Sequence, residues 1–403
     1  MRVLIPTHFP LTGSGSGVYV DNVARQLVRA GHDVLVVVPD HEAVPDREFA
    51  CRTLLFSNGS RSHTDLPFDF PCFTTHPRSA NTFYALTPHE IDEYVDAFRH
   101  AIGSAVQEFA PDLIHAQHLW VTAFCASELH LPYVVTSHGT DLIGFDRDAR
   151  YHDMVHAGAQ SASRIIAISR QVAQSIGERI DVAESKIVTI GNGFDPAVFH
   201  PDRSGDDMLL RELKIPTDAG PLLTFVGKLT HFKGADVLIQ AAGTYEQEFP
   251  AAATLIVGDG ESRSRLEQLS KSGPARGVVF LGHRPQKQVA ALLRAADLHV
   301  MPSRGEPFGI AALEALACGT PVVGTNAGGL PDFISDEVGA LVPVDDPDAL
   351  AQAIVREIAA GSKGTKGPAA ARYALENFTW ELQVAKLITV YEEAVAAGRS
   401  AGG

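Results

Sequence analysis

The hydrophobic positions of the chain form two kinds of segment: short apolar runs, and longer stretches in which apolar residues recur every three or four positions. The short runs predict buried strands, and the longer stretches predict amphipathic helices. In the first half of the chain, strands are predicted at residues 3–6, 33–39, 112–117, 132–138, 163–169 and 186–190. Runs that are apolar at nearly every position are typical of parallel strands that are covered on both faces.

A second series of apolar runs begins after a polar segment at residues 192–207. Its strands are predicted at residues 221–227, 253–260, 277–282, 296–303, 320–325 and 339–344. Helical segments separate the strands in both series, as they do in consecutive βαβ units. The pattern therefore predicts an α/β protein with two doubly wound domains, connected by the polar segment.

The domain boundaries are predicted from this division. Residues 1–197 are expected to form an N-terminal Rossmann-like domain, and residues 198–377 a C-terminal one. Residues 378–403 are expected to form a C-terminal helix that crosses back to the N-terminal domain, since FTWELQVAKLITVYEEAV is amphipathic. The stretch 45–88 is rich in Pro, His and Phe and is interpreted as a strand or two with long loops.

Charge and composition narrow the class of protein. The 33 basic and 48 acidic residues give a net charge of −15, which disfavours nucleic acid and an anionic membrane surface as partners. No run reaches about 18 apolar residues, and the first residues do not resemble a signal peptide, so we expect a cytoplasmic protein without stable membrane insertion. The four cysteines show no CxxC pair and no zinc-like spacing, so no metal site is predicted and the thiols are expected to be reduced.

Two segments of the first half carry candidate chemistry. The glycine-rich stretch 13–17 joins the first predicted strand to a helix, where glycine lets a backbone approach a ligand closely or simply makes a tight turn. The stretch matches neither GxGxxG nor a Walker loop. In SHGTDL, His138 and Asp141 follow a predicted strand directly. A histidine there can hydrogen-bond a ligand hydroxyl or a developing charge, or be satisfied by neighbouring backbone. Other histidines, such as His76, are expected at the surface or in loops.

The loop VGKLTHFKG follows the first predicted strand of the second series. It places Lys228 and Lys233 at the sheet edge where ligands bind in α/β proteins. In an acidic protein, two cations around one such turn favour a diphosphate ligand, although a solvated loop would contain lysines too.

Two carboxylates with seven residues between them, Glu306 and Glu314, lie in SRGEPFGIAALEALACGTPVVGTNAGG. The pattern is strand, loop, helix, turn and strand, so the first turn of the helix, with its unpaired N–H groups, suits a phosphate. Glu314 lies among apolar residues of a helix that must pack on the sheet, where a carboxylate is costly unless it is hydrogen-bonded. Ribose hydroxyls would satisfy it; the alternative is two ordinary exposed glutamates.

The same segment strongly resembles the E-x7-E region of retaining GT-B glycosyltransferases of family 4, the glycogen-synthase-like group. The motifs HGTD, NGFD, VGKLTHFKG, GDGE and the closing FTW helix stand in the family's order along the whole chain. The resemblance implies two Rossmann-like domains with a cleft between them. It also implies a nucleotide-sugar donor, bound mainly by the second domain.

Carried over by position, the resemblance assigns the donor to Gly15, Lys228, Lys233, Arg284, Glu306, Phe308, Gly309, Ile310 and Glu314. Lys228 and Lys233 match the cationic pair on the diphosphate, although the family usually has Arg at the first position. Glu306 matches the carboxylate on the sugar hydroxyls, and Glu314 the ribose ligand. Arg284 lies in the loop that usually meets the base.

The remaining donor positions match backbone. Residues 308–310 match the segment that meets sugar and phosphate, and Gly15 matches a glycine that faces the phosphate. The catalytic positions implied are His138, near the anomeric centre, with Lys233 and Glu306. Gly17, Asp141 and Asn192 are candidate acceptor-binding residues.

The family mechanism is front-face displacement with retention, in which an oxygen of the leaving diphosphate helps to deprotonate the acceptor. It needs no cofactor or divalent metal beyond the nucleotide-sugar co-substrate. We therefore expect transfer of glucose or N-acetylglucosamine from a UDP-sugar to a small soluble hydroxyl acceptor. A homodimer is compatible with this expectation.

GSGV and HGTD also look similar to a narrower group, the N-acetylglucosaminyl-malate synthases. Two alternatives stay open. One is a nucleotide-sugar epimerase of similar architecture, and the other is a non-catalytic nucleotide-sugar-binding protein.

Overall fold

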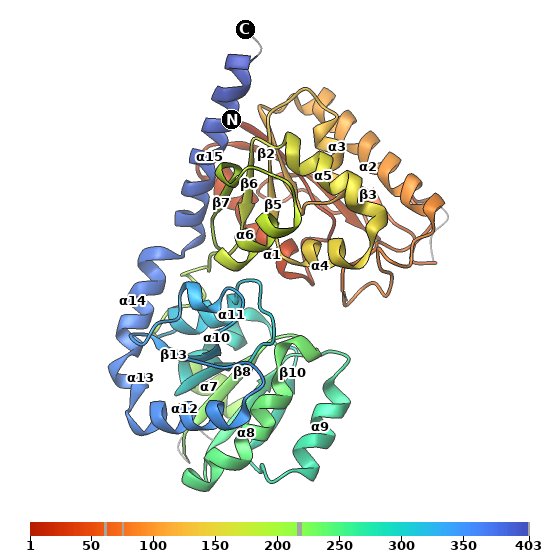
Figure 1. The fold of residues 1–403 in the computed structure, drawn as a ribbon. Helices are drawn as coiled ribbons and strands as arrows, with labels where there is room; N and C mark the ends of the chain where they lie inside the picture. The colour runs from red at the N-terminus through yellow and green to blue at the C-terminus, as the bar shows by residue number, and fades with distance from the viewer. Residues whose placement is uncertain (60–62, 75, 216–219, 402–403) are drawn as a thin grey trace. The chain divides into compact units, whose positions relative to one another are not determined.

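The computed structural model describes residues 1–59, 63–74, 76–215 and 220–401, with the side chains of 400 and 401 left out. The chain divides into two compact units (Figure 1). Unit 1 comprises Met1–Gly191 and Trp380–Gly403, and unit 2 comprises Asn192–Thr379. The chain therefore passes from one unit to the other at two places.

The first crossing lies a few residues before the predicted boundary at 197/198, and the second just after the predicted boundary at 377/378. The segment predicted as a polar linker belongs to unit 2. Arg294 explains this assignment, because its guanidinium pairs with Asp206 at 2.6 and 2.7 Å and donates to the Val198 carbonyl at 3.2 Å. The predicted cleft between the two domains stays a prediction.

Unit 1 is built on a seven-stranded sheet with the order β3-β2-β1-β4-β5-β6-β7, in which every pairing is parallel. Its strands are β1 (Arg2–Pro6), β2 (Asp33–Asp40), β3 (Ala50–Leu55), β4 (Leu113–Gln117), β5 (Tyr133–Ser137), β6 (Arg164–Ala167) and β7 (Ile187–Thr189). In the stretch 45–88, β3 and isolated bridges between loop residues confirm the expectation of a strand with long loops.

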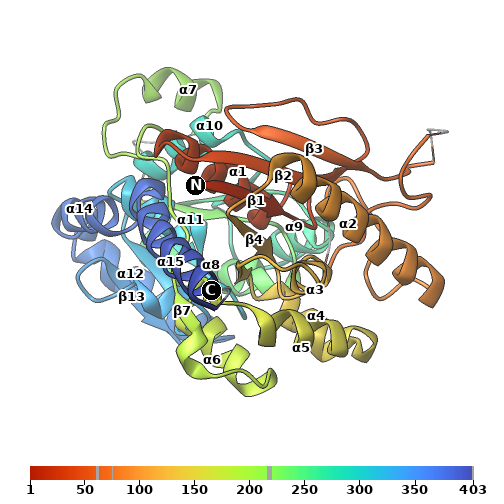
Figure 2. The same ribbon diagram turned by 90° about the horizontal axis from the view of Figure 1, so that it is seen from above.

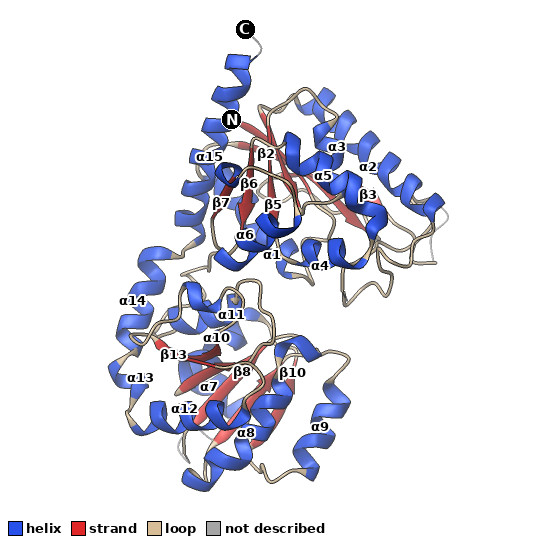
Figure 3. Ribbon diagram, viewed as in Figure 1, coloured by secondary structure: helices blue, strands red, loops and turns tan. Residues whose placement is uncertain are grey.

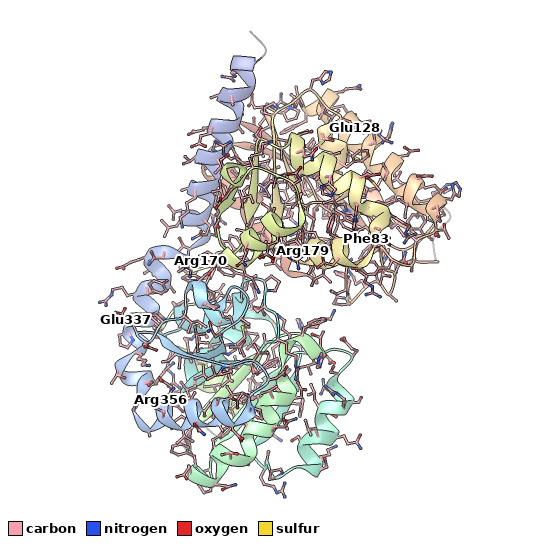
Figure 4. The ribbon with its side chains drawn as sticks, in the orientation of Figure 1. Phe83, Glu128, Arg170, Arg179, Glu337 and Arg356 are labelled. Carbon is pink, nitrogen blue, oxygen red and sulfur yellow. The ribbon has the colours of Figure 1, made fainter. Side chains whose placement is uncertain are left out.

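Helices cover both faces of this sheet (Figure 3). They are α1 (Gly15–Arg29), α2 (Pro88–Phe109), α3 (Val121–Ser127), α4 (Thr140–Arg147), η1 (Ala149–Tyr151), α5 (His152–Ser161), α6 (Arg170–Arg179), η2 (Glu184–Lys186) and α15 (Trp380–Ala401). Helix α2 packs on β1, β2 and β3, and α3 on β4 and β5, whereas α15 contacts α1, β4 and β5. Figure 4 labels Arg179 of α6, whose guanidinium pairs with Asp146 of α4 at 3.0 Å.

The C-terminal helix α15 is an integral part of unit 1. Leu387 and Tyr391 of this helix share one apolar cluster with Val20 and Val23 of α1 and with alternate residues of the central strands. The Tyr391 hydroxyl also lies 2.6 Å from His115 Nδ1 on β4. Figure 2 shows α15 in the view from above.

Unit 2 contains a six-stranded parallel sheet with the order β10-β9-β8-β11-β12-β13. Its strands are β8 (Leu222–Val226), β9 (Ala253–Val257), β10 (Val278–Gly282), β11 (Leu298–Met301), β12 (Val322–Thr325) and β13 (Gly339–Val342). Its helices are α7 (Asp206–Glu212), η3 (His231–Lys233), α8 (Ala235–Glu248), α9 (Arg263–Ser272), α10 (Gln286–Ala295), α11 (Ile310–Ala317), η4 (Leu330–Asp332), α12 (Pro347–Ala359), α13 (Ser362–Thr365) and α14 (Gly367–Asn377).

Each predicted strand corresponds to an observed one, so the two doubly wound sheets are confirmed. In each sheet the strand order reverses once, between β1 and β4 in unit 1 and between β8 and β11 in unit 2. Loops that leave the carboxyl ends of the strands diverge at such a reversal and open a crevice in which ligands bind. Within the described part of the chain, no helix is both long enough and apolar enough to span a membrane.

Candidate active site

In unit 2, the loops after β8 and β11 are locked together by Arg304. Its backbone N–H donates to the Phe232 carbonyl at 2.8 Å, and its guanidinium donates to Asp236 at 2.9 and 3.0 Å and to the His231 carbonyl at 2.6 Å. Burial alone would raise the pKa of Asp236, but the Arg304 guanidinium more than offsets it and holds that pKa below its usual value. The turn that carries Lys233 is therefore held by a residue of the loop that follows β11.

Gly234 completes this contact. It adopts φ +68°, and a Cβ atom at this position would lie only 1.9 Å from the Pro302 carbonyl oxygen. Glycine is required both for the left-handed conformation and for the close approach of the two loops.

Lys233 and Glu306 form an ion pair through Nζ and Oε2. The Glu306 side chain is 8% exposed and that of Lys233 is 26% exposed, so the carboxylate is enclosed and the ammonium reaches solvent. A buried carboxylate needs a cation or hydrogen-bond donors, and Lys233 supplies the cation in this state. The sequence assigned these two residues to different parts of one ligand, and the structure shows that they contact each other.

The start of α11 lies next to this pair. Gly309 is the residue before the helix, at φ +106°, and no side chain caps the first turn. The Gly329 N–H donates to the Glu306 carbonyl at 2.8 Å, and a Cβ atom at Gly328 would lie 2.0 Å from the same oxygen. The first N–H groups of a helix have no partner within the helix, so this end of α11 can receive an anion.

Phe308 and Ile310 flank Gly309 and differ in exposure. Phe308 is buried and packs on Phe333, with ring centroids 5.2 Å apart. Ile310 is only half-buried. Within this segment Phe308 and Gly309 are therefore enclosed, and Ile310 is the residue that reaches solvent.

Glu314 lies one turn further along α11. Its side chain is half-buried, and burial raises its pKa to about 8. Among the described residues its carboxyl group has no hydrogen bond or ion pair. A carboxyl group in this state is available to hydroxyl groups, as either donor or acceptor.

Lys228 and Arg284 lie after other strands of the same sheet. Lys228 is half-buried in the loop that follows β8. Arg284 follows β10, which lies at the edge of the sheet, and its Nε is buried without a partner among the described atoms. The donor residues predicted in unit 2 therefore come from the carboxyl ends of three strands of one sheet.

In unit 1, the glycine-rich loop leads into α1. The Ser14 hydroxyl caps the helix by accepting from the Gly17 N–H at 3.0 Å. Gly15 is exposed, and a Cβ atom added there would have no neighbouring atom within 4 Å, as expected for a position that faces a ligand. Gly17 differs, because a Cβ atom there would lie 2.1 Å from the Pro10 carbonyl. The presence of glycine at position 17 is therefore explained by packing, without a contact to an acceptor.

His76 packs against this loop. It lies in a loop itself, as one of the two expectations had it, but it is buried and not at the surface. Its Nε2 lies 3.2 Å from the Thr12 carbonyl oxygen. A Cβ atom at Gly13 would lie 2.8 Å from the same nitrogen, so the imidazole packs directly on the glycine-rich turn.

His138 follows β5 and is 7% exposed. Its Nε2 lies 3.0 Å from Gln117 Oε1, and its ring packs edge-on against Tyr19 with centroids 4.9 Å apart. Burial lowers the pKa of His138 to about 3, so the imidazole is neutral at physiological pH.

Asp141 does not have the environment predicted for an acceptor ligand. It is 1% exposed, and its carboxylate accepts from the Leu119 N–H at 2.8 Å and from the Ser137 hydroxyl at 3.0 Å. These contacts tie the turn after β4 to the end of β5, which is a structural role. Asn192, the third candidate, is a buried residue of unit 2 with Oδ1 unpaired among the described atoms. It therefore belongs to a different unit from Gly17 and Asp141.

The turn after β4 was not predicted as part of a site. His118 adopts φ +68°, and both of its ring nitrogens are buried without a partner among the described atoms. Its ring centroid lies 4.6 Å from that of His138. The segment HAQH ends a predicted strand beside the HGTD strand, and this position at the sheet edge was the available signal. By contrast, nothing in the sequence around Arg304 indicated that its side chain joins the loops after β8 and β11.

The sequence profile of the Glycosyl transferases group 1 matches residues 211–363, and that of Glycosyltransferase Family 4 matches residues 13–198. A relative named D-inositol 3-phosphate glycosyltransferase, from Salinispora tropica, is 33% identical over 98% of this chain and 84% of its own. An uncharacterised glycosyltransferase of Methanocaldococcus jannaschii is 28% identical over 96% of both chains.

Solved structures agree with the fold. Sucrose-phosphate synthase from Thermosynechococcus elongatus superposes with a TM-score of 0.78 at 24% identity, over 98% of this chain and 99% of its own. An Anabaena protein solved with UDP and glucose gives a TM-score of 0.73 at 21% identity, over 99% of this chain and 100% of its own. The two parallel-sheet units define a GT-B glycosyltransferase fold. The chain belongs to the group 1 and family 4 glycosyltransferases.

Proposed function

We propose that this glycosyltransferase moves glucose or N-acetylglucosamine from a UDP-sugar to a small soluble hydroxyl acceptor, with retention of the anomeric configuration. The observation that carries the proposal is the Lys233–Glu306 pair beside the uncapped start of α11. A cation, a carboxylate and free backbone N–H groups at one sheet edge match the parts of a nucleotide-sugar: a diphosphate next to a ring of hydroxyls.

Donor binding exchanges partners within this pair. Lys233 turns from Glu306 to a diphosphate oxygen, and the carboxylate of Glu306 then accepts hydrogen bonds from sugar hydroxyls. Lys228 and the start of α11 share the remaining diphosphate charge. Glu314 binds the ribose hydroxyls, which supply the partners that its carboxyl group lacks among the described residues.

In the reaction, the bond between the anomeric carbon and the diphosphate oxygen breaks while the bond to the acceptor oxygen forms on the same face. The acceptor proton passes to an oxygen of the leaving diphosphate, so no side chain is needed as nucleophile. Two lysines and a helix start stabilise the leaving charge by fixed positive groups, and the proposed mechanism therefore needs no divalent cation.

The acceptor proposal starts from the relatives. Several curated relatives are named D-inositol 3-phosphate glycosyltransferases, so an inositol phosphate is the first acceptor to test. The resemblance to N-acetylglucosaminyl-malate synthases makes malate the second. Both molecules are small, soluble and anionic. Inositol phosphate has several hydroxyl groups, and malate has one.

The test is a donor screen by release of the nucleoside diphosphate, with UDP-glucose, UDP-N-acetylglucosamine and GDP-mannose, each with inositol phosphate or malate. We expect UDP and a glycosylated product that keeps the donor's anomeric configuration, and unchanged rates in EDTA. A new free nucleotide-sugar without a second product would indicate an epimerase instead. Thermal stabilisation by UDP-sugars without turnover would indicate a binding protein, and a rate restored only by Mn²⁺ or Mg²⁺ would contradict the metal-free mechanism.

A further inference from the structure

The surroundings of His138 leave one ring nitrogen for a ligand. The rings of Tyr19 and His118 pack against it, with centroids 4.9 and 4.6 Å away, and Nε2 lies 3.0 Å from Gln117 Oε1. Among the described residues Nδ1 has no hydrogen-bond partner, and it is not one of the buried atoms that the protein fully covers. The exposed 7% of this residue therefore includes the one unused polar atom of its side chain.

The orientation of the Gln117 amide follows from its second contact. Gln117 Nε2 lies 3.3 Å from the His115 carbonyl, which can only accept, so the NH₂ group must face His115. The amide oxygen then faces His138. Because that oxygen can only accept as well, the hydrogen of the neutral imidazole must be on Nε2 and the lone pair on Nδ1.

His115 is itself held firmly on β4. Its Nδ1 lies 2.6 Å from the Tyr391 hydroxyl of α15, and its Nε2 lies 2.7 Å from Thr136 Oγ1 on β5. The carbonyl that orients Gln117 is therefore part of a strand tied on one side to its neighbour and on the other to the C-terminal helix. The chain of contacts determines the hydrogen position on His138 without any charged group.

We propose that Gln117 is a positioning residue that keeps His138 in the Nε2–H tautomer, so that Nδ1 accepts a hydrogen bond from a substrate hydroxyl. A neutral ring that presents a lone pair attracts O–H groups and repels the oxygens of a phosphate or carboxylate. Of the two ligand-binding roles among the three that the sequence left open for His138, the geometry selects recognition of a hydroxyl over stabilisation of a negative charge. The assignment of that hydroxyl to the sugar or the acceptor rests on the proposed function; the tautomer does not.

The imidazoles and the phenol around His138 are uncharged. Burial lowers the pKa of His115 to about 3 and that of His118 well below its usual value, and it raises the pKa of Tyr19. They come from β4, the turn after it and α1, which are the elements that pack against the ring. Asp141, three residues further on, is engaged by the Leu119 N–H and the Ser137 hydroxyl.

The decisive variant is Gln117→Glu, which keeps the shape and places a carboxyl group against Nε2. An additional proton then binds to the Glu–His pair at a higher pH than it binds to the wild-type ring, and it leaves a hydrogen on Nδ1. We expect kcat/KM to fall about tenfold or more relative to wild type at pH 6 and to recover to within about threefold at pH 9, since one hydrogen bond is lost and regained. Wild type is expected to show a flat profile over this range.

The matched control is Gln117→Met, which has similar volume and no acceptor. Without the amide oxygen the ring can adopt either tautomer, so its rate should drop at every pH with no new pH dependence. Melting temperatures of both variants test whether each is folded. A flat profile for a folded Gln117→Glu, or a pH-dependent one for Gln117→Met, would overturn the positioning role.

A second readout needs no substrate. In ¹⁵N-histidine-labelled protein, long-range ¹H–¹⁵N spectra report which ring nitrogen is protonated, and His138 is assigned by comparison with His138→Gln. We expect a protonated Nε2 and an unprotonated Nδ1 in wild type between pH 6 and 9, and protonation of Nδ1 in Gln117→Glu at the acid end. The opposite tautomer in wild type would refute the proposal. The expected tautomer in a protein that transfers no sugar would refute the proposed function alone.

Discussion

The carboxyl edges of the two sheets differ in the kind of polar group they present. In unit 2 the groups are charged and lie in loops: Lys233 pairs with Glu306, and Arg304 with Asp236. In unit 1 the groups are neutral and buried, with His138, Gln117 and His118 in contact with one another. The comparison indicates that the edge of unit 2 is suited to an anionic ligand and that the edge of unit 1 is suited to neutral groups that form hydrogen bonds.

Burial explains the difference. A charge can be kept near a sheet edge when a counter-ion is within reach or when part of the side chain is solvated, as for Lys233, which is 26% exposed. His8, His115 and His118 are completely buried, and burial lowers the pKa of each, so they cannot be kept as cations. The two edges therefore use different chemistry although their sheets have the same topology.

The largest effect is expected from the charged pair itself. Glu306→Ala and Lys233→Ala should each reduce sugar transfer about 1,000-fold, because the sugar hydroxyls or the leaving charge lose a fixed partner. The measurement is product formation at saturating donor, with circular dichroism as a check of folding. Glu337→Gln, at an exposed residue labelled in Figure 4, is the control and should leave the rate unchanged.

A double variant sharpens the same comparison. If Lys233 and Glu306 act on one ligand, the double alanine variant should be much less impaired than the product of the two single effects, since each single change leaves a partner unpaired. Near-wild-type rates for both single variants would show that the charged edge of unit 2 is not the active site.

Removal of the Arg304 side chain, which joins the loops after β8 and β11, should mainly affect the stability of the fold. Arg304→Ala leaves the buried Asp236 carboxylate without its bidentate partner, and we expect the free energy of unfolding to fall by about 2–3 kcal/mol. Donor KM should rise as well, because the turn that carries Lys233 loses its attachment. Arg356→Ala, at an exposed position of α12, is the control for chemical denaturation. Equal stability of the two variants would mean that the Arg304 side chain does not hold the two loops together.

Gly309→Ala tests the shape of the helix start without changing charge. An alanine at φ +106° is strained, and its Cβ would lie 2.4 Å from Leu330 Cδ2, so about 1–2 kcal/mol of stability should be lost. Gly103→Ala in α2 has no atom near the added Cβ and should be neutral or slightly stabilising. Thermal unfolding compares the two, and a harmless Gly309→Ala would contradict the need for glycine at this position.

The last prediction concerns Glu314 and pH. Its folded pKa of about 8 lies above the model-peptide value of 4.5, so the folded protein holds a proton that the unfolded chain has released. Ligand-free stability should therefore decrease as pH rises from about 4.5 to about 8, and Glu314→Gln should remove that part of the decrease. Melting curves of both proteins across this pH range provide the measurement. Parallel curves would show that the Glu314 environment does not raise its pKa.

Much of the fold was predictable from local pattern. Apolar runs predicted the strands, because a strand buried on both faces must be apolar whatever lies around it. The positions of Lys233, Glu306 and Glu314 after strands of one sheet were also predicted from the sequence, since motifs in segments that follow a strand keep their spacing. The boundary near residue 192 was less accurate, because the contact between Arg294 and Asp206 joins residues 88 positions apart.

The site in unit 1 was less predictable for a related reason. The roles of His138 and Asp141 depend on partners from another strand: Gln117 for the former, and Leu119 for the latter. Nothing in HGTD alone distinguishes a histidine that faces a ligand from an aspartate that holds a neighbouring turn. The sequence does not distinguish Gly15 from Gly17 either. Only their surroundings show that the first position is open and the second is packed.

The sequence by itself determined the α/β architecture, the strand segments and the acidic net charge, because hydrophobic spacing and residue type express them locally. It also determined the resemblance that the group 1 and family 4 profiles bear out. Tertiary structure alone decided which groups are paired, buried or neutral: that Lys233 contacts Glu306, that Asp141 is structural, and that Gln117 orients His138. The physical reason is that a side chain's charge and hydrogen position depend on the solvent it loses and the partners it gains, and both come from distant parts of the chain.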